Sequence, residues 1–301
     1  MLTYNNYYDT KECIGSLLNN TLTPRSIIII DNGSHDDSIE RLKSDLQNNP
    51  TIIFVQNPAN FGFARGMNIG IKLALRQGGD FICLINNDTV LEKNCLKNLY
   101  LAITKAENIG IVGPRIFYWC EPERIWHGGG YYSFILSNVY IPEKNKIIKE
   151  TANYQKKVTF LTGCVWMVRK EVFKKVGLLD EDFFFYSEDT DFCLRTIKKG
   201  FSLLYVPNAH VWHKIQSISK SRITPFFLYH MAKSKIILSR KHFCFLYSLY
   251  TVLLVIFVYT PFRIIQIMQG TRNFRHLIAW FRGIFAGIVQ PICKKYTNDI
   301  E

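Results

Sequence analysis

Three acidic residues, Glu188, Asp189 and Asp191, lie within four positions of one another beside an aromatic run. Like charges at this spacing repel one another, which raises the pKa of a carboxyl group and suits it to act as a general base. Asp191 also lies four residues before Arg195, which is the spacing of an ion pair along a helix. Because Asp189 and Asp191 cannot share one helical face, we expect them to have different roles.

Polar segments also follow two short apolar runs, residues 26–30 and 81–85, that are typical of buried parallel strands. Ligands bind at the carboxyl ends of such strands in open sheets. Asp31 begins a DNGS segment, and its carboxylate can accept hydrogen bonds from a nucleobase or a ribose. Asp88 lies in an NNDT segment and suits a hard cation such as Mg²⁺ or Mn²⁺. Each segment alone also fits an ordinary turn.

Two further features could contribute to a ligand site. They are a glycine-rich segment, residues 60–70, and an isolated histidine, His213. Glycines let the backbone approach a ligand closely, and the start of a helix can face phosphate. The glycine spacing is not that of the GxGxxG dinucleotide motif, and close helix packing explains these glycines equally well. A lone histidine such as His213 is more often structural, unless a carboxylate and a metal need it.

The elements that must position these residues alternate between short apolar runs and amphipathic segments, which predicts an α/β domain with a mostly parallel sheet. We expect strands at residues 26–30, 51–55, 81–85, 109–112, 159–168 and 202–206. We expect helices at residues 34–46, 63–76, 91–105, 170–176 and 188–199. A capping box between Ser34 and Asp37 would open the first helix. Residues 118–157 are less regular and fit loops or a small hairpin.

Positive charge is concentrated in the C-terminal part of the chain. The 301 residues carry a net charge of +13, but residues 214–301 alone hold 13 basic and two acidic residues. This distribution predicts that one end binds an anionic surface, and it argues against a nucleic-acid-binding protein charged throughout. The eight cysteines are at least twelve residues apart and form no CxxC pair. Their scatter within apolar runs indicates a reducing compartment.

The tail also contains an uncharged run of twenty residues, 243–262, with basic residues on both sides. Its length fits a bilayer crossing, and its flanks fit anionic headgroups, whereas core helices of a soluble domain are the alternative. A second apolar run, 277–292, contains Arg282, which is costly at the centre of a bilayer. We therefore expect shallow or re-entrant insertion of the tail instead of two full spans.

Seven short motifs follow one another along the chain. They are Thr3-Tyr4-Asn5-Asn6, Ile30-Asp31-Asn32-Gly33-Ser34, Asn60-x-Gly62-Phe63-x-x-Gly66-x-Asn68-x-Gly70, Leu84-x-Asn86-Asn87-Asp88, Thr162-Gly163, Glu188-Asp189-x-Asp191-x-x-x-Arg195 and Trp212-His213. Together they resemble the inverting glycosyltransferases of family 2, which have the GT-A fold. The likeness covers about residues 1–215 and is closest to the rhamnosyltransferase-like branch that builds bacterial surface polysaccharide.

The resemblance implies a role for most of these residues. Asp189 matches the catalytic base, which takes a proton from the acceptor hydroxyl as that oxygen displaces the nucleoside diphosphate and inverts the anomeric centre. Asp88 and His213 match ligands of a divalent cation, Mg²⁺ or Mn²⁺, although Asn86 replaces the first Asp of a DxD motif. The nucleotide-sugar would contact Thr3, Asn5, Asp31, Asn60, Gly62, Asn68 and Asn87. The acceptor side, or the support of the site, would involve Gly163, Glu188, Asp191 and Trp212.

The implied partners are a dTDP- or UDP-sugar donor, a lipid-linked or polysaccharide acceptor and an anionic membrane surface, with no nucleic acid. We therefore expect a GT-A catalytic domain at residues 1–215, a basic helical linker at 216–242 and an apolar, basic, membrane-associated helical tail at 243–301. The expected location is the cytoplasmic face of a bacterial cell membrane.

The start of the chain departs from the family pattern. An apolar strand normally precedes the Thr-Tyr-Asn motif, but only Met1 and Leu2 do so here. Without that strand, backbone groups and apolar neighbours in the sheet are left uncovered, so we expect the natural polypeptide to start upstream of Met1. Two other interpretations stay open: a catalytically inactive nucleotide-sugar-binding relative that serves as a membrane scaffold, and a soluble protein that binds nucleic acid through its tail. The uncharged run speaks against the second.

Overall fold

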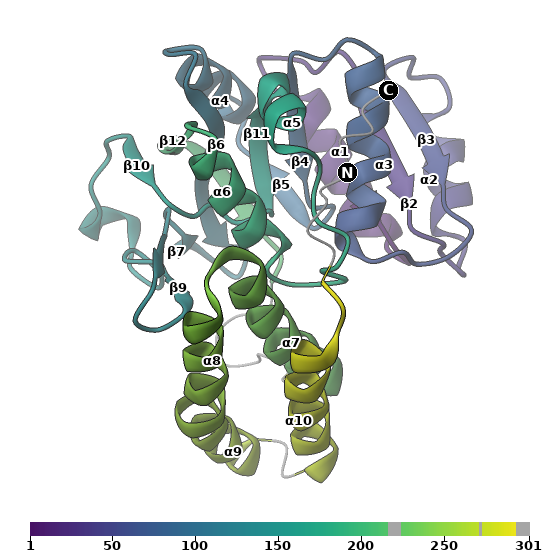
Figure 1. Cartoon of the computed structure of the whole chain (residues 1–301). Helices are drawn as coiled ribbons and strands as arrows, with labels where there is room; N and C mark the ends of the chain where they lie inside the picture. The colour runs from purple at the N-terminus through teal and green to yellow at the C-terminus, as the bar shows by residue number, and fades with distance from the viewer. Residues whose placement is uncertain (216–223, 271–272, 293–301) are drawn as a thin grey trace.

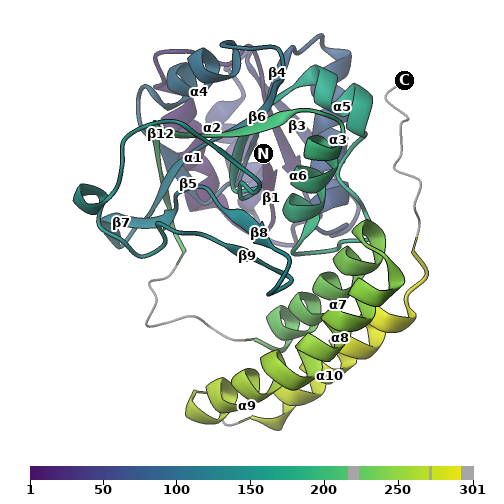
Figure 2. The same cartoon turned by 60° about the vertical axis from the view of Figure 1, so that its left-hand side comes forward.

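The computed structural model describes residues 1–215, 224–270 and 273–292. An α/β domain occupies the first part of the chain, and a group of helices projects from it as a separate C-terminal unit (Figure 1). Figure 2 shows this helical unit extending away from the sheets.

The N-terminal part of the domain is a small parallel sheet with helices packed on it. Its strands pair in the order β1–β2–β3. All five residues of β2 are buried, as an uninterrupted apolar run predicts. The elements are β1 (Leu2–Thr3), α1 (Tyr7–Leu18), β2 (Ile27–Asp31), α2 (Ser38–Leu46), β3 (Ile52–Gln56) and α3 (Phe63–Arg76).

A larger sheet follows, in the order β10–β12–β6–β11–β4, with β5 on β12 and β7 on β6. The expected mostly parallel arrangement holds for β1–β3, whereas this sheet is mixed because β11 runs antiparallel between β4 and β6. Its strands are β4 (Phe81–Ile85), β5 (Thr89–Leu91), β6 (Ile109–Tyr118), β7 (Glu121–His127), β10 (Lys156–Val158), β11 (Val165–Arg169) and β12 (Ser202–His213). The remaining elements are α4 (Cys95–Ile103), the hairpin β8 (Tyr131–Ser133) and β9 (Asn138–Tyr140), the 3-10 turn Ile148–Glu150, α5 (Lys170–Val176) and α6 (Glu188–Lys198).

Several boundaries differ from the sequence-based expectations for identifiable reasons. The capping box was wrong: α2 begins at Ser38, because the Ser34 hydroxyl instead donates to Asp31 Oδ1 at 2.6 Å. The expected helix 91–105 begins only at Cys95, because the residues before it pair with β12 as β5. The strand β6 continues past Pro114, which lies next to the register shift between β6 and β12, a position where proline is tolerated.

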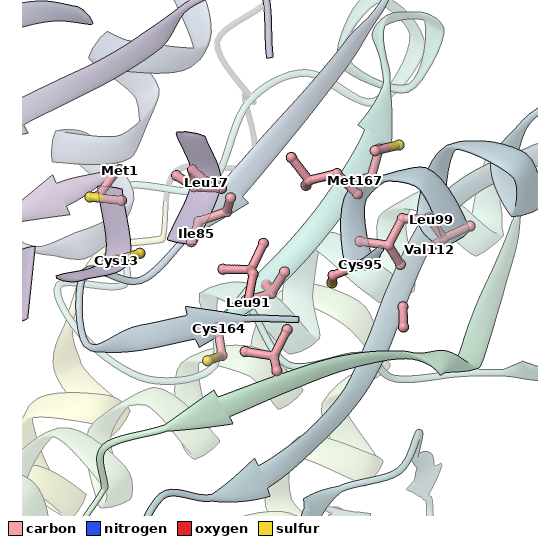
Figure 3. Close-up of a cluster of buried hydrophobic side chains, with 14 of the residues drawn as sticks. Met1, Cys13, Leu17, Ile85, Leu91, Cys95, Leu99, Val112, Cys164 and Met167 are labelled. Carbon is pink, nitrogen blue, oxygen red and sulfur yellow. The ribbon is translucent and has the colours of Figure 1, made fainter. Parts of the chain in front are cut away.

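The two sheets are joined only loosely beside β1. Leu2 forms a single parallel bridge with Asn86, and Met1 donates through its terminal amine to the Ile28 carbonyl at 2.9 Å. An apolar cavity of about 450 Å³ opens between β2 and β4. Figure 3 shows Met1 in the cluster of buried side chains that extends from α1 to β11. The upstream start expected from the sequence stays a prediction.

The helical unit has a core of its own. Its elements are α7 (Pro225–His242), α8 (Phe245–Leu254), the π-helical turn Val255–Tyr259, α9 (Thr260–Gln269) and α10 (Phe274–Val289). Leu228 and Ile236 of α7 pack with Trp280 and Ile284 of α10, so the segment expected as a linker instead supplies the central helix of this unit. A Cβ atom on Gly283 would lie 2.3 Å from the Tyr229 carbonyl oxygen, because α10 crosses α7 very closely at its Gly-x-x-x-Gly sequence.

The end of α7 fixes the helical unit to the α/β domain. His242 Nε2 lies 2.7 Å from Asp191 Oδ1, and the other oxygen of Asp191 accepts from Arg195 Nε at 2.8 Å. Lys241 Nζ lies 2.6 Å from Asp180 and 2.5 Å from Asp182. The i,i+4 ion pair expected for Asp191 and Arg195 is therefore present, and it is part of a buried charge network between α6 and α7.

Replacing Asp191 by Asn is expected to lower the free energy of unfolding by about 3–5 kcal/mol, because it leaves the buried charge of Arg195 without its partner. Thermal unfolding of the full chain measures this loss. Asp37→Asn is the matched control, since the side chain of Asp37 is 73% exposed and its ion pair with Arg41 is a surface contact. Equal melting temperatures for the two variants would show that the network contributes no stability.

Candidate active site

Asp31 is the last residue of β2, so its carboxylate lies at the carboxyl end of that strand. It is buried, and its Oδ1 atom accepts from the backbone N–H of Ser34 at 3.0 Å as well as from the Ser34 hydroxyl. Ser34 Oγ in turn accepts from the backbone N–H of Asn5 at 2.9 Å, and Asn5 has a left-handed φ of 48°. Two of the residues predicted to contact the nucleotide, Asn5 and Asp31, are therefore held together by one serine.

The glycine-rich segment packs against the loop that leads to α6. Gly62 has φ of 79°, and a Cβ atom there would lie 2.6 Å from the Phe184 carbonyl oxygen. The neighbouring Asn60 side chain is exposed and accepts from Asn32 Nδ2 at 2.9 Å. Close approach of two loops thus requires glycine at position 62, whether or not a ligand also contacts it.

Three other predicted nucleotide-contacting residues have hydrogen bonds within the protein. Asn68 donates to the Leu179 carbonyl at 2.9 Å and accepts from the Leu179 N–H at 3.0 Å, which ties α3 to the loop before α6. Asn87 donates to Thr10 Oγ1 at 2.9 Å and to Thr3 Oγ1 at 3.3 Å. These contacts give all three a structural role that the sequence did not indicate, while nucleotide contact stays a prediction for them.

Asp88 and His213, which are 125 positions apart, come into direct contact. Their atoms Oδ1 and Nε2 are 3.0 Å apart, because β12 pairs with β5 so that His213 lies opposite Thr89. His213 is buried, and the ring of Trp126 packs edge-on against it at 4.6 Å. Burial acts to raise the pKa of the Asp88 carboxyl, but the interaction with His213 outweighs it and holds that pKa below the ordinary value.

These donors fit a divalent cation whose remaining ligands come from the substrate. A carboxylate oxygen and an imidazole nitrogen suit Mg²⁺ or Mn²⁺, which usually keep several positions for phosphate oxygens and water. The nearby Oδ1 atom of Asn86 is buried and has no hydrogen-bond partner among the residues that the structure describes. In the part of the chain that the structure describes, no cluster of three or more His, Cys, Asp or Glu side chains is arranged to hold a metal by itself.

The first turn of α6 holds two carboxyl groups that titrate together. Asp189 Oδ1 accepts from the Thr190 N–H at 2.7 Å, and Oδ2 accepts from the Gly163 N–H at 3.3 Å. The Oε2 atom of Glu188 is buried without a partner among the described residues. Burial raises the pKa of both groups, and the adjacent charge of Asp189 helps to raise the pKa of Glu188 to about 8. At neutral pH Glu188 therefore keeps its proton.

One loop, residues 162–164, connects the two carboxylate regions. Gly163 bonds to Asp189, while the next carbonyl, that of Cys164, accepts from the Asn86 N–H at 2.8 Å. A Cβ atom on Gly163 would lie 3.3 Å from the Asp189 Cβ atom. Asp189 and the Asp88–His213 pair thus lie on either side of the same short loop.

Two of the predicted supporting residues lie outside this centre. Asp191 belongs to the buried network with Arg195 and His242. Trp212 stacks on Phe117 and donates to the Pro122 carbonyl at 3.2 Å. Sequence reasoning missed Trp126, which packs on His213, because it lies in a segment whose irregular pattern hid the strand β7.

Replacing Glu188 by Gln is expected to stabilise the protein at neutral pH. In the fold this carboxyl keeps its proton up to about pH 8, whereas in the unfolded chain it loses the proton near its ordinary pKa of 4.5. The Glu188 contribution is therefore complete below pH 4.5 and is lost as the pH rises towards 8. Melting temperatures at pH 5 and pH 7.5 test this, since the advantage of the glutamine variant should grow with pH. A constant difference would contradict the raised pKa.

Comparison with known proteins places this geometry in context. Residues 1–177 match the family model described as glycosyl transferase family 2. The dTDP-rhamnosyl transferase RfbF of Shigella flexneri is 26% identical over 224 residues, which are 72% of this chain and 71% of the relative. The N-acetylglucosaminyl-diphospho-decaprenol L-rhamnosyltransferase of Mycobacterium tuberculosis is 25% identical over 234 residues, covering 70% of this chain and 74% of the relative.

A solved structure shares the fold. The crystal structure of GalNAc-T7 with UDP, GalNAc and Mn²⁺ superimposes with a TM-score of 0.62 at 16% sequence identity. The match covers 80% of this chain but only 47% of that one, so the likeness concerns the shared domain and its arrangement of strands and helices.

Proposed function

Because the chain belongs to glycosyl transferase family 2 and has the GT-A fold, we propose that it is an inverting glycosyltransferase that transfers a sugar from a nucleotide-sugar to a hydroxyl of a lipid-linked glycan. The observation that carries this proposal is the arrangement of Asp189 and an Asp88–His213 pair on either side of the loop 162–164. The names of the two rhamnosyltransferase relatives support a dTDP-linked deoxysugar as the donor, with UDP-sugars as the other class to test.

The residues divide the work of an inverting displacement. Asp31 and Asn5 lie where a nucleoside would bind, and Asp88 with His213 would hold Mg²⁺ or Mn²⁺ against the diphosphate. When bound, the cation neutralises the charge that gathers on the leaving diphosphate. Asp189 takes the proton from the acceptor hydroxyl, whose oxygen attacks the anomeric carbon opposite the leaving group. Because Glu188 keeps its own proton at neutral pH, Asp189 is the member of the pair that accepts the proton of the hydroxyl.

A donor screen tests the proposed function. The purified full chain is incubated with single dTDP-, UDP- and GDP-sugars and a lipid-diphosphate-sugar acceptor, and the released nucleoside diphosphate is measured. Release that depends on the acceptor is expected for one donor class. If the protein binds nucleotide but releases no nucleoside diphosphate with any of these donors, the result would instead support a catalytically inactive scaffold.

We also propose that the helical unit docks on an anionic membrane, at the cytoplasmic face where nucleotide-sugars are made. The stretch Phe245–Gln269 is long and apolar enough to cross a bilayer, yet only 22% of its most apolar window is buried. A core helix of a soluble protein would be largely covered. Exposed basic side chains on the same unit, among them Arg275 and Arg282, fit anionic headgroups.

A hairpin of the α/β domain extends this apolar surface. Ile135 at the tip between β8 and β9 is 78% exposed, with Phe134 and Leu136 also exposed on either side. The carbonyls of these three residues each accept from one tyrosine hydroxyl of the helical unit, and the donors are Tyr247, Tyr250 and Tyr259. The views in Figures 1 and 2 both place this hairpin beside the helices. The tip and the helices thus form one face that would meet the bilayer together, which fixes the tilt of the catalytic domain.

Replacing Leu246 and Phe257 by Glu in the full chain is expected to release the protein from membranes. Both side chains are more than 70% exposed on the apolar face, and burying two carboxylates in lipid is unfavourable. Flotation with vesicles containing anionic lipid at high salt measures the effect, because apolar burial is not screened by salt. Leu101→Glu, at a position on α4 that is 52% exposed and lies outside the helical unit, is the control. Unchanged flotation of the double variant would contradict the membrane assignment.

A further inference from the structure

Lys235, in the middle of α7, is a buried cation for which the described residues supply no anionic partner. The residue is 8% exposed, and its ammonium group donates to the Ser137 carbonyl at 2.8 Å and to Asn138 Oδ1 at 3.1 Å. It also lies 4.9 Å from the centre of the Tyr259 ring. Among the described residues no carboxylate lies within 4.0 Å of its ammonium group. Buried lysines are rare unless they are paired, so this arrangement requires an explanation.

The same helix shows what a paired buried lysine looks like. Lys241, six residues further along α7, has a side chain that is only 1% exposed, and it contacts the carboxylates of Asp180 and Asp182. No such partner of Lys235 is found in the described part of the chain, and burial together with the positive charge of Arg263 lowers its pKa to about 7. The fold therefore neutralises one lysine at this junction and leaves the other facing neutral groups.

A small cavity opens beside Lys235. Its volume is about 50 Å³, which is room for more than one water molecule. Half of its lining residues carry a hydroxyl group, and they are Tyr132, Ser137, Tyr186, Ser187 and Thr190. Tyr186 and Ser187 have left-handed φ angles of 67° and 69°, a strained conformation that is common at ligand-binding loops.

The cavity shares a wall with the catalytic centre. Ser187 directly precedes the Glu188–Asp189 pair, and Thr190 donates to Asp189 through its N–H. On the other side, Met231 lines the cavity and lies 3.9 Å from the guanidinium of Arg263, whose Nε atom is buried without a partner in the described part of the chain. The cavity thus lies between the proposed base and the proposed membrane face, with Lys235 in its lining and Arg263 behind Met231.

We propose that this cavity binds a phosphoryl group of a lipid, held by Lys235 and the surrounding hydroxyls. A phosphoryl group would supply the missing anion and accept several charge-assisted hydrogen bonds. Its position beside α6 suits the diphosphate of a lipid-linked acceptor, which would then present its sugar to Asp189. This assignment of the source rests on the proposed function, whereas the binding of the phosphoryl group itself does not. The second possible source is the headgroup of an anionic phospholipid.

Titration calorimetry of the full chain in detergent micelles tests the proposal without requiring sugar transfer. The probes are farnesyl diphosphate, farnesol and a micelle-dispersed phosphatidylglycerol. We expect farnesyl diphosphate to bind at least about tenfold more tightly than farnesol, and Lys235→Met to abolish that difference. Lys233→Met is the matched control, since Lys233 lies on the same helix but does not line the cavity. Ser187→Ala, which removes a lining hydroxyl with no hydrogen-bond partner in the described residues, should weaken binding several-fold and carries little risk to folding.

The outcomes separate the sources and the alternatives. Tight binding of farnesyl diphosphate that phosphatidylglycerol does not displace supports the acceptor diphosphate, whereas full displacement supports a phospholipid headgroup. Equal binding of farnesyl diphosphate by the wild-type, Lys235→Met and Ser187→Ala proteins would overturn the site and leave Lys235 as a structural contact of the β8–β9 hairpin. Absence of sugar transfer with every donor would refute the proposed function without affecting this result.

Discussion

Replacing Asp189 by Asn is expected to reduce sugar transfer by about 10²–10⁴-fold while leaving nucleotide binding nearly unchanged. Glu188 keeps its own proton at neutral pH, so Asp189 is the proposed acceptor of the proton of the acceptor hydroxyl, and Asn cannot accept that proton. The hydrogen bonds from Gly163 and Thr190 to this side chain can largely be retained by the amide oxygen, so the loop should keep its position. Single-turnover transfer and nucleotide titration on the same preparation measure the two quantities.

The pH profile gives this prediction a second test. Because burial raises the pKa of Asp189, activity of the wild type should fall as the pH drops through that raised value. Asp37→Asn, on the exposed start of α2, serves as the control and should retain both the rate and the profile. Near-normal turnover of Asp189→Asn would remove Asp189 from the role of base.

Removing the cation, or its proposed ligand Asp88, is the second change with a large expected effect. Excess EDTA should stop transfer, and Mn²⁺ or Mg²⁺ added back should restore it, because the leaving diphosphate needs its charge neutralised. Asp88→Ala should lower the affinity for nucleoside diphosphate only when the cation is present, since the carboxylate acts through the metal. Calorimetric titration of UDP and dTDP with and without Mn²⁺ separates the two conditions.

His213→Ala should have the same cation-dependent effect, because its Nε2 atom lies 3.0 Å from Asp88. Full activity of the wild type in EDTA, or equal weakening of nucleotide binding with and without Mn²⁺ in both variants, would contradict a shared metal site.

The sequence predicts the elements with a clear periodicity well. The expected strand 81–85 and the expected helices 63–76 and 170–176 have the bounds of β4, α3 and α5. Short apolar runs between turn residues mark such elements unambiguously. Longer strands were underestimated: β6 and β12 continue into the site through residues such as Pro114 and His210, whose place in a strand depends on pairing with the other strand.

The candidate site could be predicted only in part. The segments that hold Asp31 and Asp88 are recognisable because each comes at the end of an apolar strand. The segment that holds Asp189 is recognisable because it opens a helix with a cluster of acidic residues. Contacts between segments that are far apart in the sequence cannot be read from local patterns. Two examples are the hydrogen bond from Asn68 to the Leu179 carbonyl and the packing of Trp126 on His213. The cavity beside Lys235 exists only because α7 folds back on α6, and no pattern in α7 distinguishes Lys235 from its neighbours.

The most direct test of the central claim is the anomeric configuration of the product. The enzyme is supplied with the donor identified by the screen, whose sugar has a known configuration, and the newly formed glycosidic bond is assigned by the one-bond carbon–hydrogen coupling of its anomeric centre in NMR spectra. A single displacement assisted by Asp189 predicts a product with the opposite configuration to the donor. A product that retains the donor configuration would contradict the account, because direct attack by the acceptor oxygen cannot produce it.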